Sequence, residues 1–133
     1  MTKNATATGL FILRATLAIF FLVWALEKFI KPDTTAAIWE AFYFVEDLPA
    51  VMSYAVGVIQ IGALVAFALG AFKFWSYGFF LVIHGLGTLT TWQTLINPYE
   101  GSNHLFIAAI PVLGALIALF LMRKQDTLLS IGK

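Results

Sequence analysis

The sequence contains no cysteine. Disulfide exchange, thiolate metal sites, iron–sulfur clusters and thioether attachment of haem all need a thiol, so this chain supports none of them. Charge is also scarce, because only 11% of the residues are charged and the formal net charge is +1. Nucleic-acid binding needs several lysines or arginines gathered on one face, and the sequence has no such cluster. It also has no nucleophile–base pair, phosphate loop or paired carboxylates that would indicate a hydrolase.

What the sequence has in abundance is apolar side chains. Hydrophobic residues make up 61% of the chain, and the mean hydropathy is +0.90. A soluble domain is nearer half apolar and a quarter charged, so this composition indicates a bilayer protein. A span needs about 20 helical residues, and four apolar segments qualify: residues 9–30, 48–72, 74–96 and 105–122. We therefore predict an all-α, polytopic membrane protein, with residues 1–133 forming one left-handed four-transmembrane-helix bundle.

The longest predicted connection, residues 31–47, has a pattern of its own. Pro32-Asp33-Thr34 is a helix-start signal with Asp33 or Thr34 as the N-cap. Apolar and aromatic residues then recur at helical spacing, at Ile38, Trp39, Phe42 and Tyr43. This pattern predicts a short interfacial amphipathic helix between the first and second spans. It serves either as an ordinary aromatic belt or as a lid over the outer mouth of the bundle.

The other two connections are turns. Residues 71–74 leave so little chain between the second and third spans that these must form an antiparallel hairpin. Residues 97–104 contain Asn-Pro and Gly-Ser, which are typical of a turn.

The distribution of charge predicts the orientation. The side with both termini has six basic residues, whereas the other side has two basic residues and six acidic ones. The first group is Lys3, Arg14, Lys73, Arg123, Lys124 and Lys133; the second is Lys28 and Lys31 with Glu27, Asp33, Glu40, Glu46, Asp47 and Glu100. The positive-inside rule then places both termini in the cytoplasm. The first apolar run is span-length, so we expect it to be a retained helix and not a cleaved signal peptide. We expect the membrane to be a bacterial or archaeal inner (cell) membrane.

Two features concern the packing of these helices. Arg14 lies near the start of the first span, where its long side chain can snorkel to the interface. Gly62, Ala66 and Gly70 recur at four-residue spacing in the second span. This stripe of small residues predicts close helix packing inside the bundle rather than dimerisation.

The third span contains an unusually polar stretch, Ile83 to Leu95. Helical spacing places His84, Thr88 and Thr91 on one stripe with Trp92 beside it. Gln60 and His84 lie about equally far from the tight turn, so we expect them to form a hydrogen bond near the membrane midplane. Gln60, His84, Thr88, Thr91 and Trp92 are therefore a candidate ligand-binding cleft, with His84 exchanging a proton with a small polar ligand. The alternative is a polar seam that only packs the helices together.

A second polar group is predicted at the outer end of the bundle. Glu27 and Lys28 lie near the end of the first span, and Asn103 and His104 directly precede the fourth. They either close the outer mouth together or are simply solvated. His84 and His104 lie in different layers of the membrane, so no metal site is expected.

These residues carry a resemblance to the DoxX family of small four-helix membrane proteins, related to DoxD-type subunits of thiosulfate:quinone oxidoreductase. It covers about residues 10–122. The matching motifs are Leu13-Arg14, Glu27-Lys28-Phe29, Gln60-x-Gly62 leading to Leu69-Gly70, and Asn103-His104-Leu105-Phe106 leading to Pro111-Val112-Leu113. Trp24 departs from the pattern, because the family often has glycine there. The resemblance implies a subunit or accessory of a membrane oxidoreductase that acts near the quinone pool.

Three functions follow as hypotheses. The leading one is a DoxX-like membrane subunit of a quinone-linked, respiratory-type oxidoreductase, with quinone as its ligand and no covalently bound cofactor. The second is a purely structural or assembly subunit of a larger membrane complex. The third is a small-molecule channel or carrier lined by Gln60, His84 and the threonines. In each case the expected partners are the lipid bilayer and other membrane subunits or further copies of the chain, and not nucleic acid.

Overall fold

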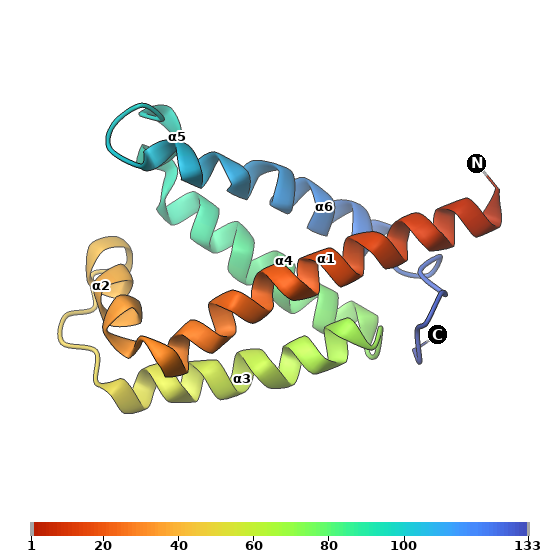
Figure 1. Cartoon of the computed structure of the whole chain (residues 1–133), viewed down its shortest axis with the longest axis horizontal. Coiled ribbons are helices and arrows are strands. Elements are labelled where there is room, and N and C mark those ends of the chain that lie inside the picture. The colour runs from red at the N-terminus through yellow and green to blue at the C-terminus, as the bar shows by residue number, and fades with distance from the viewer. Residues whose placement is uncertain (1, 133) are drawn as a thin grey trace.

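The computed structural model describes residues 2–132, and every regular element within that range is helical, as the sequence predicts. The elements are α1 (Lys3–Ile30), α2 (Pro32–Tyr43), α3 (Ala50–Ala68), α4 (Lys73–Thr90), α5 (Trp92–Ile96), the 3-10 helix η1 (Asn103–Ala108) and α6 (Ala109–Leu121). Figure 1 shows that the start of α1, the turn between α3 and α4 and the C-terminal tail lie at one end of the bundle, the terminal end. At the opposite end, the α2 end, lie α2, α5 and η1.

Three of the described segments are long and apolar enough to cross a membrane: α1, α3 and the continuous stretch Asn103–Leu121. This supports a membrane protein. The 18-residue α4 is not among them, because Lys73, His84 and several small or hydroxylated residues lower its hydropathy. A fourth span therefore stays a prediction.

The core is an aromatic and aliphatic cluster between the four long helices. The inward face of α1 repeats every three or four residues, which is the period of one helix face. Its buried residues are Leu10, Arg14, Leu17, Phe21, Ala25 and Lys28. The Phe21 ring packs against the rings of Phe67 in α3 and Phe80 in α4, with centroids 6.3 and 4.6 Å away. Beyond this shared core, α1 packs mainly against α3 and α4 mainly against α6, and the two pairs diverge toward the α2 end (Figure 1).

The close approach of α1 and α3 occurs at Gly57. A Cβ there would lie 2.7 Å from the Phe29 ring and 2.9 Å from Lys28 Cβ, so only glycine fits. Nearby, Ser53 Oγ donates a hydrogen bond of 2.8 Å to Lys28 O. The expected packing at Gly62 is wrong, because a Cβ at Gly62 would meet nothing within 4 Å.

The segment after α1 forms a helix, as predicted, but its start differs. The N-cap is Lys31 and Pro32 is the first helical residue, so neither Asp33 nor Thr34 caps it. Proline suits this position because its missing N–H would have no partner inside the helix. The helix packs against α1 and α3, and the Phe42 and Phe106 ring centroids are 6.2 Å apart. Its position at a membrane interface stays a prediction.

Two predicted spans have different boundaries in the structure. The predicted segment 74–96 is interrupted at Thr91, where α4 ends and the short α5 begins. The predicted segment 105–122 begins as η1 and continues as α6, which places Pro111 in the first turn of α6. The tight turn after α3 is confirmed. It uses left-handed backbone at Gly70 and Phe72, with φ of 64° and 47°.

Candidate functional site

The terminal end contains a buried ion pair that joins the two ends of the chain. Arg14 of α1 and Asp126 of the C-terminal tail are both fully shielded from solvent, and Arg14 Nη1 lies 2.7 Å from Asp126 Oδ2. The expectation that Arg14 snorkels to the interface is therefore wrong. A carboxylate within the fold is available to it, and that carboxylate neutralises the guanidinium where it is buried.

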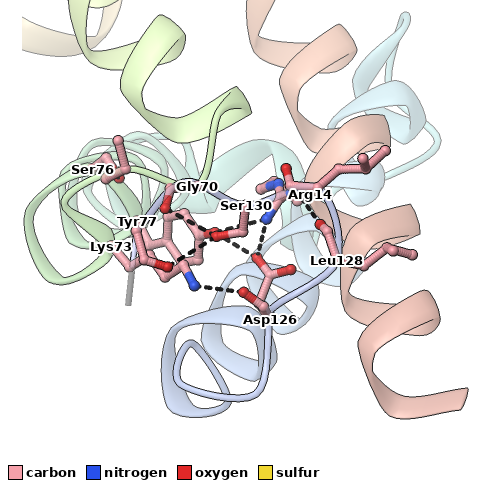
Figure 2. A network of polar contacts seen from close by, with 11 residues as sticks. Arg14, Gly70, Lys73, Ser76, Tyr77, Asp126, Leu128 and Ser130 are labelled. Carbon is pink, nitrogen blue, oxygen red and sulfur yellow. Dashed lines mark hydrogen bonds and ion pairs between the residues drawn. The ribbon is translucent and has the colours of Figure 1, made fainter. Parts of the chain in front are cut away.

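Further donors surround the same carboxylate (Figure 2). The Tyr77 hydroxyl donates to Asp126 Oδ2 at 2.5 Å, and Lys73 Nζ donates to the backbone oxygen of Asp126 at 2.5 Å. Asp126 thus receives donors from α1 and α4, and it links those helices to the tail.

The tail is also held through its backbone. Arg14 Nη2 donates to Leu128 O and Leu129 O at 2.8 and 2.7 Å. The Ile131 and Gly132 amides donate to Leu69 O and Gly70 O, each at 3.0 Å. Residues 126–132 therefore cross the terminal end between α1 and the α3–α4 turn (Figure 2). The sequence-based reasoning missed Asp126. The available signal was that the side with both termini holds one acidic residue among its basic ones.

The predicted hydrogen bond between Gln60 and His84 is absent from the structure. His84 Nε2 lies 2.9 Å from Ala109 O, so the bond joins α4 to α6, whereas Gln60 Oε1 has no partner among the described residues. The reason is that the two helix pairs diverge. α3 packs mainly against α1 and α4 mainly against α6, so α3 and α4, which carry Gln60 and His84, separate toward the α2 end (Figure 1).

The threonines of the polar stretch bond to their own helix. Thr88 Oγ1 donates to His84 O at 2.8 Å, and Thr91 Oγ1 donates to Gly87 O at 2.8 Å. Trp92 is 53% exposed. Of the predicted cleft residues, Gln60 and His84 therefore each still have a side-chain atom free to accept a hydrogen bond inside the bundle. The hydroxyls of Thr88 and Thr91 still have lone pairs but have already used their hydrogens.

Buried oxygens without partners gather in the half of the bundle toward the α2 end. Three of the four such oxygens within residues 2–132 lie there, namely Glu27 Oε1, Thr35 Oγ1 and Gln60 Oε1 from α1, α2 and α3, and the fourth is Asp126 Oδ1 at the terminal end. The contact of Lys28 with Gly57 places Glu27 and Gln60 within about one helical turn of the same level. Unpaired buried acceptors are costly, so their presence marks a place where a donor is missing.

The predicted outer mouth is only partly assembled. Lys28 is buried, and its Nζ donates to Trp24 O at 3.3 Å, so this side chain turns back along α1. Asn103 Nδ2 donates to Asn97 O at 3.1 Å, and His104 is exposed. No hydrogen bond or ion pair within residues 2–132 joins Glu27 or Lys28 to Asn103 or His104.

The same range of residues contains no group of three or more histidine, aspartate or glutamate side chains that could hold a metal ion.

Comparison with protein-family models finds no match, and comparisons with curated proteins and with solved structures find none either. The resemblance to the DoxX family therefore stays a prediction.

Proposed function

We propose that this chain is a DoxX-like integral membrane accessory subunit of a quinone-linked oxidoreductase, and that its polar interior holds the reduced, dihydroxy head group of a quinone. The observation that carries the proposal is the set of buried acceptors without donors, Glu27 Oε1 and Gln60 Oε1, in the same half of the bundle as His84.

The hydrogen bond of His84 supports this assignment. A backbone carbonyl can only accept, so Nε2 carries the proton that bonds to Ala109 O. In the neutral ring, Nδ1 is then an acceptor. The rings of Phe20 and Phe21 lie edge-on to the imidazole, with centroids 6.2 and 6.0 Å away. His84 thus offers one basic nitrogen in apolar surroundings.

Acceptors without donors fit a ligand with two hydroxyl groups better than a ligand with two carbonyls, because a hydroxyl donates a hydrogen bond and a carbonyl cannot. One hydroxyl of a quinol would donate to His84 Nδ1, and the other would donate to Gln60 Oε1 or Glu27 Oε1, nearer the α2 end. A bound quinone supplies two-electron redox chemistry, with two protons exchanged per head group. In this proposal His84 and Glu27 hold or return those protons, and a redox group in a partner subunit exchanges the electrons.

The proposal includes an orientation. We propose that α4 forms a fourth span beside the three apolar segments, because it lies antiparallel to α3 across a turn of four residues. We further propose that both termini are cytoplasmic in a bacterial or archaeal inner membrane and that α2 lies at the outer interface. The excess of basic residues at the terminal end supports this orientation.

One observation favours a second candidate, the structural or assembly subunit. The His84 bond to Ala109 O already joins α4 to α6, and interhelical bonds of this kind are worth about 0.6–2 kcal/mol in membrane proteins. A channel or carrier is less well supported, because the backbone and side-chain bonds of residues 126–132 cross the terminal end.

The test is ligand binding by the purified protein in detergent micelles. We expect a short-tail ubiquinol to raise its melting temperature, whereas the dimethyl ether of that quinol, which cannot donate hydrogen bonds, should leave it unchanged. In the Gln60→Leu and His84→Phe variants the quinol affinity should fall at least tenfold, the loss of about 1.4 kcal/mol expected for an unmade buried hydrogen bond.

Gln93→Leu is the matched control, because Gln93 is an exposed glutamine outside the bundle core. It should bind the quinol as the wild type does. Equal shifts with the quinol and its ether, or no shift with either, would show that these acceptors do not hold a dihydroxy ring.

A further inference from the structure

An open apolar groove of about 920 Å³ runs along the outside of α3 and α4. Its lining comes from residues of these two helices, from Phe72 in the turn between them and from Phe120 of α6. The one hydroxyl among the lining side chains belongs to Ser76, and this hydroxyl donates to Ala71 O at 2.7 Å, so it is satisfied within the chain. The groove therefore offers only apolar contact to an occupant.

A second hollow, of about 310 Å³, adjoins the groove at the terminal end. It is lined by Lys73, Arg123 and Lys124, together with Phe72, Phe74 and Trp75. The same three aromatic residues also line the apolar groove, so the two hollows are continuous. Phe72 and Trp75 are 77% and 75% exposed, which leaves this junction open at the surface.

The basic groups of this hollow differ in their burial and in the hydrogen-bond partners they already have. Lys73 is buried and its ammonium bonds to Asp126 O. The guanidinium of Arg123 lies over the Phe74 and Phe120 rings, 5.5 and 4.6 Å from their centroids, and its Nη1 donates to Phe120 O. Its other nitrogens have no partner within residues 2–132. Lys124 is exposed and likewise makes no ion pair there.

Within residues 2–132, no acid balances these charges locally. Asp126 is the acidic residue of the terminal end, and it is buried against Arg14 and Tyr77. The remaining acidic residues belong to the α2 end or its loops: Glu27, Asp33, Glu40, Glu46, Asp47 and Glu100. An anion at Arg123 and Lys124 therefore meets two unneutralised cations with a third cation, Lys73, behind them.

From this arrangement we infer a binding site for an anionic phospholipid. The phosphate of the head group contacts Arg123 and Lys124, and one acyl chain lies in the groove between α3 and α4. Basic pockets beside apolar helix faces bind lipid head groups of this charge. The groove and the basic hollow share three lining residues, so they lie side by side as the acyl chain and the phosphate of a phospholipid do.

The test uses the fluorescence of Trp75, which lines both hollows. In a Trp24→Phe, Trp39→Phe, Trp92→Phe background, the protein is placed in phosphatidylcholine vesicles that contain brominated phosphatidylglycerol. We expect the anionic lipid to quench Trp75 at much lower mole fraction than brominated phosphatidylcholine does. Arg123→Gln with Lys124→Gln should weaken this preference about thirtyfold, which corresponds to about fivefold for each lost charge.

Lys31→Gln is the charge-matched control at the α2 end, and it should leave the preference intact. Ala66→Phe fills the groove and should reduce quenching by the brominated chains while the net charge stays the same. Equal quenching by the two lipids, equal loss in Lys31→Gln, or full competition by soluble glycerol phosphate would each overturn the assignment.

Discussion

Arg14 and Asp126 are 112 residues apart in sequence, and their side chains form a 2.7 Å ion pair that solvent does not reach. This contact connects the first helix to the tail that follows the last one. Because the pair is buried, its energetic role differs from that of a surface salt bridge, and it can be tested by removing each partner separately.

Asp126→Asn is expected to lower the free energy of unfolding by about 3–5 kcal/mol, because it leaves the Arg14 charge buried without a counter-ion. The double variant Arg14→Met, Asp126→Leu should recover part of that loss, since it buries no charge. Equilibrium unfolding in detergent micelles measures both. Glu46→Gln, at an exposed acid, should change stability by less than about 0.5 kcal/mol. Equal small effects in all variants would mean that the pair does not hold the tail.

Tyr77→Phe removes one donor from the same carboxylate and leaves the ring in place. The hydroxyl bonds to Asp126 Oδ2 and is buried with it. We expect a loss of about 1–3 kcal/mol, the cost of a hydrogen bond to a charged group. The effect should vanish in the Asp126→Leu background, and a double-mutant cycle measures this coupling. An unchanged loss of stability in that background would show that the Tyr77 hydroxyl does not act through Asp126.

Two glycines of α3 should respond oppositely to the same substitution. Gly57→Ala places a methyl 2.7 Å from the Phe29 ring, so it should destabilise the protein by about 1–3 kcal/mol. Gly62→Ala meets nothing within 4 Å and should stabilise α3 by about 0.5–1 kcal/mol through its helix propensity. Melting temperatures of the two variants decide the matter, and a stabilised Gly57→Ala protein would contradict the close approach of α1 and α3.

His84→Ala should cost about 0.6–2 kcal/mol of stability, because it removes the bond from α4 to Ala109 O and the aromatic contacts with α1. Thr88→Val, one turn away, should have a smaller effect, since the Thr88 hydroxyl bonds only within α4. Unfolding midpoints in micelles provide the comparison. Identical losses would indicate that the polar stretch acts as a whole rather than through His84.

The sequence predicted the helices well, because apolar runs of span length and the tight turn before Lys73 are local signals. The helix of residues 32–43 was also readable from its spacing. Only its start differs, because Pro32 takes the first helical position and the cap is Lys31 rather than a polar residue after the proline. The break at Thr91 was not predicted, because the run without charged residues continues through it.

The polar contacts were predicted poorly, because they depend on which residues of different helices lie at the same level. The arithmetic that paired Gln60 with His84 assumed straight helices that stay side by side from the turn. In the structure α3 follows α1 and α4 follows α6, so the two residues separate. The Arg14–Asp126 pair escapes prediction for a similar reason, because its partners are 112 residues apart and no local pattern indicates that they meet.

The proposed role in a quinone-linked complex is tested most directly in native membranes. The chain and any fixed-stoichiometry partners are isolated together, and quinol-dependent electron transfer is measured with the wild type, His84→Phe, Gln60→Leu and the Gln93→Leu control. The account predicts partners that carry a redox group, and activity that falls at least tenfold in the first two variants but not in the control. Electron transfer that is unchanged in all of them, or isolation without any redox partner, would contradict it.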